Sequence, residues 1–276
     1  MNPHADYPVD LKAMVASLWQ HRQLIVVMTQ REIIGRYKGS VLGLFWSLVQ
    51  PLFMLALYTL VFSGVFNARL SASPTQNHVE FALILFVGLI LHGFFTEVLG
   101  RAPMQITSNI NYVKKIVFPL HILPVINLGA ALFHGLVSLA VLLAAILLLR
   151  GHLPLSAAYL PLVLLPFFLI TLGLAWLLTA LGVYLRDIGQ GIGMLMTVLL
   201  FASPVFYPLS ALPLALQEVL LLNPLTVAIE ESRRILMDGK APQWNTLGIY
   251  SIVGLVITWA GYAWFQKTRR GFANVL

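Results

Sequence analysis

The sequence contains no cysteine and few charged residues, and both shortages narrow the class of protein that it encodes. Without cysteine it can form no disulfide, thiolate metal site or cysteine nucleophile. Charged residues make up 10% of the 276 positions and hydrophobic residues 59%, whereas a soluble domain carries about a quarter charged residues. Several uncharged runs reach the ~20 residues that a helix needs to cross a bilayer. We therefore predict an all-α, polytopic membrane protein.

Motifs of ATPases and membrane enzymes are also missing. There is no phosphate loop of the form G-x-x-x-x-G-K-[ST], no G-x-S-x-G, no H-E-x-x-H and no acidic cluster of a membrane glycosyltransferase. The seven histidines lack the paired spacing of metal ligands, so no metal site is expected. Glu97 is the one acidic residue inside a predicted span, whereas ion-coupled transporters usually place charge near mid-bilayer. We expect a transport subunit that is not an enzyme, binds no cofactor itself and draws its energy from another subunit.

Charge changes abruptly between Arg31 and Pro51, which read REIIGRYKGSVLGLFWSLVQP. This change is typical of a chain that passes from water through the lipid headgroups into hydrocarbon. Residues 1–40 are predicted to be a cytoplasmic segment and do not read as a cleaved signal peptide. Within them, apolar residues from Leu11 to Trp19 follow helical spacing with Asp10 placed as a cap. That short helix would lie in the membrane interface or, alternatively, pack on a soluble partner.

The region 41–276 is predicted to form a membrane domain of six spans. The predicted spans are 41–66, 81–100, 122–149, 155–185, 188–202 and 245–265. Four prolines divide residues 203–243 into pieces too short to cross, so we expect two short re-entrant helices, the second starting at Pro224 after Asn223. The protein is predicted to lie in the cytoplasmic membrane with both termini on the cytoplasmic side. Twelve of the seventeen Lys and Arg are then cytoplasmic, including those of the basic tail 266–276. This is the expected positive-inside bias.

The junction before the first span resembles that of ABC-2-type permeases that export polysaccharides such as O-antigen, capsule and teichoic acid. The family pattern there is an acidic-basic pair, an Arg-Tyr-basic triplet, a serine, a Leu-Gly pair, a tryptophan and a proline. The matching residues are Arg31–Glu32, Arg36–Tyr37–Lys38, Ser40, Leu42–Gly43, Trp46 and Pro51. Residues 109–124, NINYVKKIVFPLHILP, are similar to the family's loop between spans two and three. The predicted order of elements agrees along the whole chain.

The resemblance implies a homodimeric permease coupled to two copies of a cytoplasmic ABC ATPase, which would use ATP and Mg. Its implied cargo is a lipid-linked polysaccharide, most simply O-antigen on a polyprenyl pyrophosphate, which leaves through a channel at the dimer interface. Membrane lipids are further partners, and no nucleic acid is expected. The cytoplasmic connection 101–120 would dock on the ATPase through Thr107, Ser108, Asn109, Asn111, Tyr112, Lys114 and Lys115, the first three as helix caps. Alternatively, it is a positive-inside loop without a partner.

Four residues before the first span are candidates for a headgroup site: Arg31, Arg36, Tyr37 and Lys38. Guanidinium groups and lysine suit the phosphate oxygens of a lipid pyrophosphate arriving from the inner leaflet. The same charges would equally anchor the protein to anionic lipid. Both interpretations stay open from the sequence.

Aromatic residues recur where the chain is expected to reach the outer surface: Tyr58, Phe62 and Phe66 in the first span, and Phe201, Phe206 and Tyr207 after the fifth. Aromatic faces can pack against sugar rings, and the resemblance implies an aromatic belt near the channel exit. The alternative is an ordinary interfacial belt.

The polar and small residues inside the spans receive structural interpretations. We expect Glu97 to pair with Arg101 one turn later, and His92 and His134 to form interhelical hydrogen bonds. Glycines should allow close packing or a break at the cytoplasmic turn: Gly173, Gly182, Gly189, Gly191 and Gly193.

The alternative functions are a capsule, teichoic acid, drug or small-lipid exporter, an ion-coupled transporter and an enzyme acting on polyprenyl-linked sugars.

Overall fold

A computed structural model describes residues 8–61, 78–114 and 118–276. Within these ranges the protein is built from helices without strands, as predicted. The α-helices are α1 (Leu11–Gln20), α2 (Arg22–Tyr37), α3 (Trp46–Leu60), α4 (His78–Arg101), α5 (Ile110–Lys114), α6 (Leu123–Arg150), α7 (Leu160–Tyr184), α8 (Ile188–Phe201), α9 (Leu214–Leu221), α10 (Pro224–Leu236), α11 (Trp244–Thr268) and α12 (Phe272–Val275). Short 3-10 turns join several of them.

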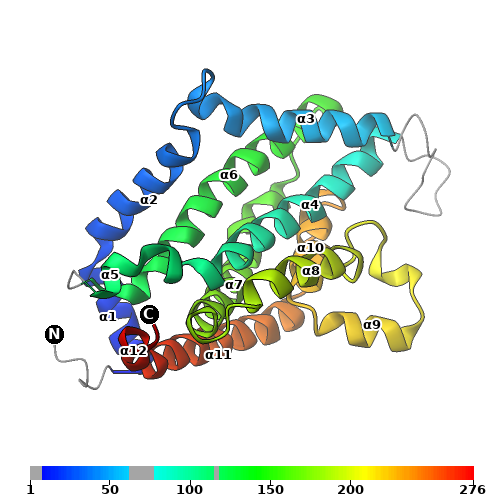
Figure 1. The fold of residues 1–276 in the computed structure, drawn as a ribbon. Coiled ribbons are helices and arrows are strands. Elements are labelled where there is room, and N and C mark those ends of the chain that lie inside the picture. The colour runs from blue at the N-terminus through cyan, green and yellow to red at the C-terminus, as the bar shows by residue number, and fades with distance from the viewer. Residues whose placement is uncertain (1–7, 62–77, 115–117) are drawn as a thin grey trace.

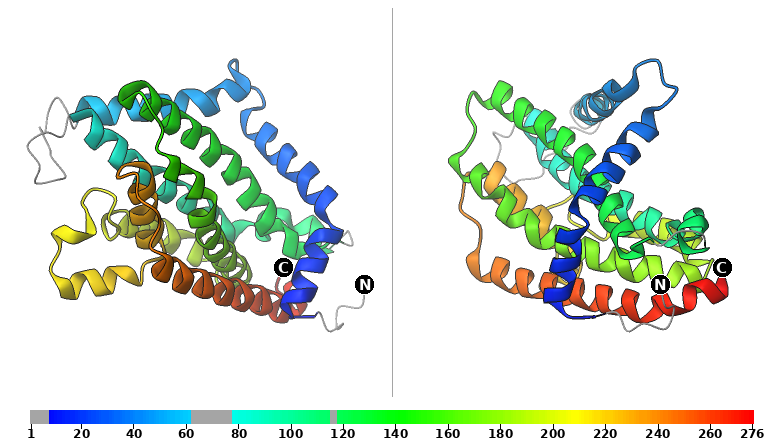
Figure 2. Two further views of the ribbon diagram at one scale, coloured as in Figure 1. Left: turned by 180° about the vertical axis from the view of Figure 1, so that it is seen from behind. Right: turned by 90° about the vertical axis from the view of Figure 1, so that its left-hand side faces the viewer.

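The long helices run alternately in two directions (Figure 1). Helices α3, α6 and α8 run away from the end that holds α1 and α12, and α4, α7 and α11 return to it (Figures 1 and 2). Met14 of α1 and Phe272 of α12 are buried in one hydrophobic cluster there. We name this the terminal end and the opposite one the distal end. The predicted tail 266–276 begins as helix, since α11 continues to Thr268, and its Phe272 is buried.

Among the described residues, five helical segments are long and apolar enough to cross a membrane, one fewer than the six spans predicted. They are 43–60, 80–104, 120–150, 155–184 and 244–275. The predicted fifth span corresponds to α8, whose 14 residues extend only ~21 Å, less than the ~30 Å hydrocarbon core. The first span starts at Gly43 rather than Val41, because the chain turns between Gly39 and Gly43, which both have positive φ. Helix α3 continues on both sides of Pro51.

The N-terminal segment contains one predicted helix and one that was not foreseen. Helix α1 begins after Asp10, as expected, although the Asp10 side chain makes no capping hydrogen bond. Helix α2 carries the charged residues before the first span, and none of its residues is buried. It lies along α6, where Gly129 allows Thr29 to approach closely (Figure 1).

The predicted pair of short helices is confirmed as α9 and α10. Pro224 occupies the first position of α10, and Asn223 Oδ1 accepts a hydrogen bond of 3.0 Å from the Leu225 amide. This cap satisfies a backbone donor that the helix start leaves without an intrahelical partner.

Arg233 of α10 is a buried guanidinium that holds the distal end together. It donates hydrogen bonds to the carbonyls of Pro204 at 2.5 Å, Val205 at 2.6 Å and Ile84 at 3.1 Å, and lies 3.4 Å from Glu230 Oε1. Burial lowers the pKa of Arg233 to about 10, so the group is charged at neutral pH. Its contacts join α10 to α4 and to the loop after α8.

The helices α7 and α11 approach each other more closely than any residue but glycine allows at their crossing. A Cβ on Gly261 would overlap the carbonyl of Gly173, and one on Gly173 would overlap the Ile257 carbonyl. Gly182 lies equally close to Pro103. The packing role predicted for Gly173 and Gly182 is confirmed. For Gly191 and Gly193 no described atom lies within 4 Å of a Cβ placed there, so close packing within the described chain does not explain them, and a break at the cytoplasmic turn stays a prediction.

Candidate functional site

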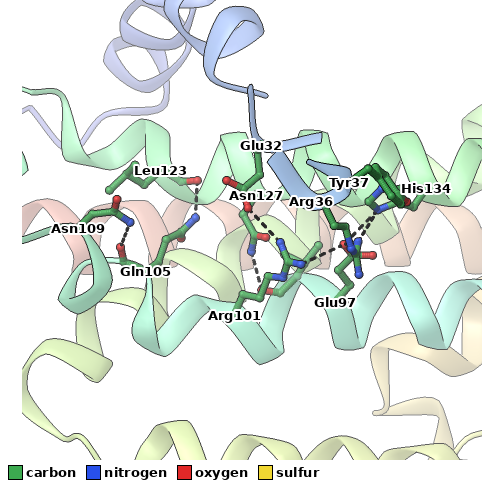
Figure 3. Close-up of polar contacts among 11 residues, drawn as sticks. Glu32, Arg36, Tyr37, Glu97, Arg101, Gln105, Asn109, Leu123, Asn127 and His134 are labelled. Carbon is green, nitrogen blue, oxygen red and sulfur yellow. Dashed lines mark hydrogen bonds and ion pairs between the residues drawn. The ribbon is translucent and has the colours of Figure 1, made fainter. Parts of the chain in front are cut away.

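A polar network joins α2 to α4 and α6 (Figure 3). Arg36 Nη1 lies 2.5 Å from Glu97 Oε1 and 2.7 Å from His134 Nδ1, and Tyr37 Oη lies 3.1 Å from His134 Nε2. An imidazole protonated at Nε2 can accept from Arg36 and donate to Tyr37. The side chains of Glu97 and His134 are 17% and 15% exposed, so both rely on these partners.

Glu97 has stronger partners than the sequence predicts. The expected pair with Arg101 exists, but at 4.0 Å it is the longest of its ion pairs. Arg101 instead lies 3.1 Å from Glu32 of α2. The correction follows from α2, which was not predicted as a helix and which brings Arg36 and Glu32 against α4. Burial raises the pKa of Tyr37, although Arg36 lowers it in part, so the phenol is protonated at neutral pH.

The other predicted intramembrane histidine, His92, forms an interhelical hydrogen bond, as expected. Its Nε2 lies 3.0 Å from the Met196 carbonyl of α8. It therefore contributes to the contact between α4 and α8 rather than to the network around Glu97.

Three of the four predicted headgroup residues line one cleft of about 1140 Å³ at the terminal end: Arg31, Arg36 and Lys38. Arg101 and Glu32 line it as well, so four cations face a single carboxylate. Among the described residues, Arg31 and Lys38 form no ion pair. We name this the cationic cleft, and its chemistry suits a phosphate group.

The cationic cleft is also lined by three residues of the predicted ATPase-docking segment, Ser108, Asn109 and Tyr112. Two side-chain hydrogen bonds hold this wall in place, Gln105 to the Leu123 carbonyl at 2.7 Å and Asn127 to the Val98 carbonyl at 2.8 Å (Figure 3). The candidate headgroup site and the candidate coupling segment therefore line one cleft. The sequence separates them by about seventy positions.

Thr107, Ser108 and Asn109 do not cap the turn in which they lie, and their predicted capping of the helix that follows stays a prediction. These residues form a 3-10 turn whose N-cap is Ile106, without a side-chain capping bond. Thr107 Oγ1 and Asn109 Nδ2 donate backwards to the carbonyls of Met104 and Gln105. The helix that follows, α5, has five residues. The side chain of Lys114 and all of Lys115 lie outside the described residues.

The remaining residues of the segment differ in exposure. Asn111 is exposed, and Tyr112 stacks on Phe118 with ring centroids 4.5 Å apart. Ser108 and Asn111 therefore present polar side chains at the surface of the terminal end.

A second cavity of about 380 Å³ lies between α3, α4 and α6. Arg36 lines both this cavity and the cationic cleft, and Tyr37, Tyr58, Glu97 and His134 line the second cavity only. The network around Glu97 therefore separates a cationic space from one that has an aromatic wall.

The predicted aromatic set is brought together only in part. Tyr58 lines the second cavity, whereas Phe201, Phe206 and Tyr207 line neither space. Phe201 stacks on Phe206 at 5.7 Å, and Tyr207 donates to the Phe201 carbonyl at 2.9 Å. Phe62 and Phe66 lie outside the described residues.

Sequence reasoning missed Glu32, Arg101 and Asn127 as parts of the site. Glu97 and His134 were noted, but not as partners of Arg36, because 61 and 98 positions separate these residues from Arg36. The one available signal was the rarity of charge in the spans, which marks intramembrane ionisable residues as functional candidates.

Known proteins resemble this chain over most of its length. The model of the family described as ABC-2 type transporter matches residues 23–237. A relative in Myxococcus xanthus, named O-antigen export system permease protein RfbA, is 30% identical over 95% of this chain and 98% of its own length. A protein of the same name in Klebsiella pneumoniae is 25% identical over 92% of this chain and 95% of its own. The polysialic acid transport protein KpsM of Escherichia coli is 27% identical over 86% of this chain and 90% of its own length. The chain belongs to the ABC-2 type transporter family.

Proposed function

We propose that this chain is the permease subunit of an ATP-driven exporter that moves a lipid-linked polysaccharide across the cytoplasmic membrane. The observation that carries the proposal is the cationic cleft, where Arg31 and Lys38 are free of ion pairs among the described residues. A pyrophosphate headgroup brings the negative charge that this cleft lacks. The relatives named for O-antigen export favour that polymer, and the relative named for polysialic acid transport keeps capsular polysaccharide as the alternative, with teichoic acid the third member of this class.

The orientation that we propose places the terminal end in the cytoplasm. Alternation of α3, α4, α6, α7, α8 and α11 supports six crossings, with α8 completed by its flanking residues (Figure 1). An even number of crossings returns both termini to one side. The cationic cleft would then open towards the inner leaflet, where a lipid-linked substrate is made available.

The path proposed for the glycan leads from the cationic cleft past Arg36 into the second cavity. Arg36 lines both spaces, so a headgroup bound to its guanidinium would compete with Glu97. Tyr58 would offer a ring face to the first sugars. A second copy of this chain would complete the channel.

Removal of the two unpaired cations tests the headgroup site. The double variant Arg31→Gln/Lys38→Gln should lower surface polysaccharide about tenfold or more, since each charged hydrogen bond contributes about 1.5–3 kcal/mol. Polysaccharide at the cell surface is measured by immunoblot in a permease-deletion strain, at matched membrane levels of the protein.

The matched control is Lys12→Gln/Lys267→Gln, which removes the same charge from exposed residues that line neither space. Export should stay normal in this control. Equal losses in both double variants would mean that the charges only anchor the protein to lipid, and normal export in both would refute the headgroup site.

Co-purification tests the proposed ATPase partner. A tagged ABC ATPase subunit from the exporter of the same organism should retain this chain with two copies of each subunit. Ser108→Trp and Asn111→Trp should each reduce the retained amount about tenfold, because both side chains are exposed beside the cleft and a bulky ring in a close-packed interface costs about 1–3 kcal/mol.

The control for docking is His152→Trp at an exposed turn of the distal end, which should bind the ATPase normally. Export that continues without any ATPase subunit would contradict the proposal and reinstate an ion-coupled transporter.

A further inference from the structure

The charges of α2 and α4 form two crossed ion pairs beside the cationic cleft (Figure 3). Glu32 and Arg36 lie one turn apart on α2, and Glu97 and Arg101 lie one turn apart on α4. Arg36 Nη1 lies 2.5 Å from Glu97 Oε1, and Arg101 Nη1 lies 3.1 Å from Glu32 Oε1. Arg36 and Arg101 both line the cationic cleft, so each of these two arginines holds a carboxylate of the other helix.

The two crossed pairs differ in how strongly they are held. The Glu97 side chain is 17% exposed, whereas the side chains of Arg101 and Glu32 are 40% and 52% exposed. An ion pair that is open to water contributes little, because water and salt screen its charges. The pair of Arg101 with Glu32 is therefore the one that a competing anion can replace most easily.

A phosphate group is a stronger partner for Arg101 than the Glu32 carboxylate is. A guanidinium donates to phosphate oxygens with the same paired geometry that it uses for a carboxylate. A pyrophosphate carries more negative charge than one carboxylate, and Arg31 and Lys38 line the same cleft without an ion pair among the described residues. Since these two cations attract the anion further, the exchange at Arg101 favours phosphate.

The second half of α2 can move when such an exchange occurs. Leu24, Ile25 and Met28 pack the first half of α2 against the hydrophobic cluster of the terminal end. Residues 30–38 are exposed apart from Ile33 and Tyr37, which are partly buried. Movement of this half away from α4 therefore exposes little apolar surface and has a low hydrophobic cost.

We infer that Arg101 is a further ligand of the lipid pyrophosphate and that Glu32 occupies it in the absence of the headgroup. This inference rests on the proposed function, because the ligand is the headgroup of the proposed cargo. Binding would exchange one ion pair for another, release Glu32 to water and remove one of the crossed pairs. Arg101 is the last residue of α4 and precedes the turn Ala102–Met104, so the headgroup would contact the element that leads to the candidate docking segment.

Farnesyl pyrophosphate, a short lipid pyrophosphate, is the probe, and its binding to the detergent-purified chain is measured by calorimetry. Arg101→Gln should raise the Kd about tenfold or more, because a charged hydrogen bond is lost. Arg101→Lys should recover part of the affinity, since lysine keeps the charge without the planar fork. The matched control Arg186→Gln removes an exposed arginine outside the cationic cleft and should leave the Kd unchanged.

A double-mutant cycle tests whether Glu32 acts by holding Arg101. Glu32→Gln should lower the Kd up to about fivefold in the parent chain, because the probe no longer competes with an exposed ion pair. In the Arg101→Gln chain the same substitution should change the Kd less than about twofold, since no guanidinium remains to be released. A carboxylate that acts only through its negative charge in the cleft would change the Kd by the same factor in both chains.

Inorganic pyrophosphate, as a second probe, separates a lipid headgroup from a soluble phosphate compound. It should respond to the variants in the same order as farnesyl pyrophosphate but bind the parent chain with a higher Kd. Binding as tight as that of the lipid form would overturn the assignment of Arg101 to a lipid headgroup.

Two further results would overturn the inference and leave the proposed function intact. One is a Kd for farnesyl pyrophosphate that Arg101→Gln does not change although Arg31→Gln/Lys38→Gln raises it. The other is an equal effect of Glu32→Gln in both chains of the cycle. Failure of the parent chain to bind farnesyl pyrophosphate would instead refute the headgroup site on which both proposals rest.

Discussion

Replacing Gly261 by alanine should abolish the stable packing of α7 against α11. A Cβ at this position would lie 2.7 Å from the carbonyl carbon and 2.9 Å from the Cα of Gly173, and both atoms belong to backbone that cannot rotate away. The helices would have to separate, and the free energy of unfolding would fall by about 3 kcal/mol. We expect the Tm of the detergent-purified protein to fall by about 10 °C.

The matched control lies on the same helix. No described atom lies within 4 Å of the position that a Cβ on Gly248 would occupy, so Gly248→Ala should raise stability slightly, since alanine favours helices over glycine by about 1 kcal/mol. The two substitutions are chemically identical and should have opposite effects. Equal Tm values for both variants would refute the close crossing.

The second large effect is expected at Arg233. Replacement by methionine keeps much of the volume but leaves the buried carbonyls of Pro204 and Val205 without this donor, and it removes the additional hydrogen bond to the Ile84 carbonyl of α4. Each unsatisfied acceptor costs about 1–3 kcal/mol, so the total is about 3 kcal/mol or more. Arg233→Met should be recovered from membranes at a small fraction of the parent level.

Two further variants sharpen this test. Arg233→Lys keeps the charge but not the planar fork that reaches several carbonyls at once, so it should be nearly as unstable as the methionine variant. Arg186→Met, in the exposed turn between α7 and α8, should change stability by no more than about 0.5 kcal/mol. Full recovery of Arg233→Lys would show that charge alone matters there.

The local features of the fold were predictable because their causes lie within a few residues. Hydropathy locates the long spans, since each must satisfy its backbone inside one apolar segment. Asn223 and Pro224 mark the start of α10 because a cap and a first-turn proline need only their immediate neighbours. The fifth span was predicted from apolar composition, and α8 is shorter than that composition suggested.

The candidate site was predictable only in its parts. The cations from Arg31 to Lys38 were identified from their place before the first span, but their helix α2 was not, because none of its residues is buried and its polarity hides the helical period. The contact of Arg36 with Glu97 depends on how α2 lies along α6, which is set by tertiary packing. Gly191 and Gly193 show the same limit, since a glycine signals close packing only where another helix passes.

The glycine contacts also determine which parts of the molecule can move. Gly173 and Gly261 join α7 to α11 backbone to backbone, and Gly182 joins α7 to the turn at Pro103, which leads directly from α4 into the wall of the cationic cleft. Interfaces packed this closely have no space in which to slide. They form one tightly packed frame that extends from the middle of α7 to the cleft. Helix α2 has no buried residue and is held to α4 and α6 by side chains rather than by backbone contacts, with a positive-φ glycine beyond its last turn. We therefore expect a transport cycle to move α2 and α3 relative to the frame of α7 and α11.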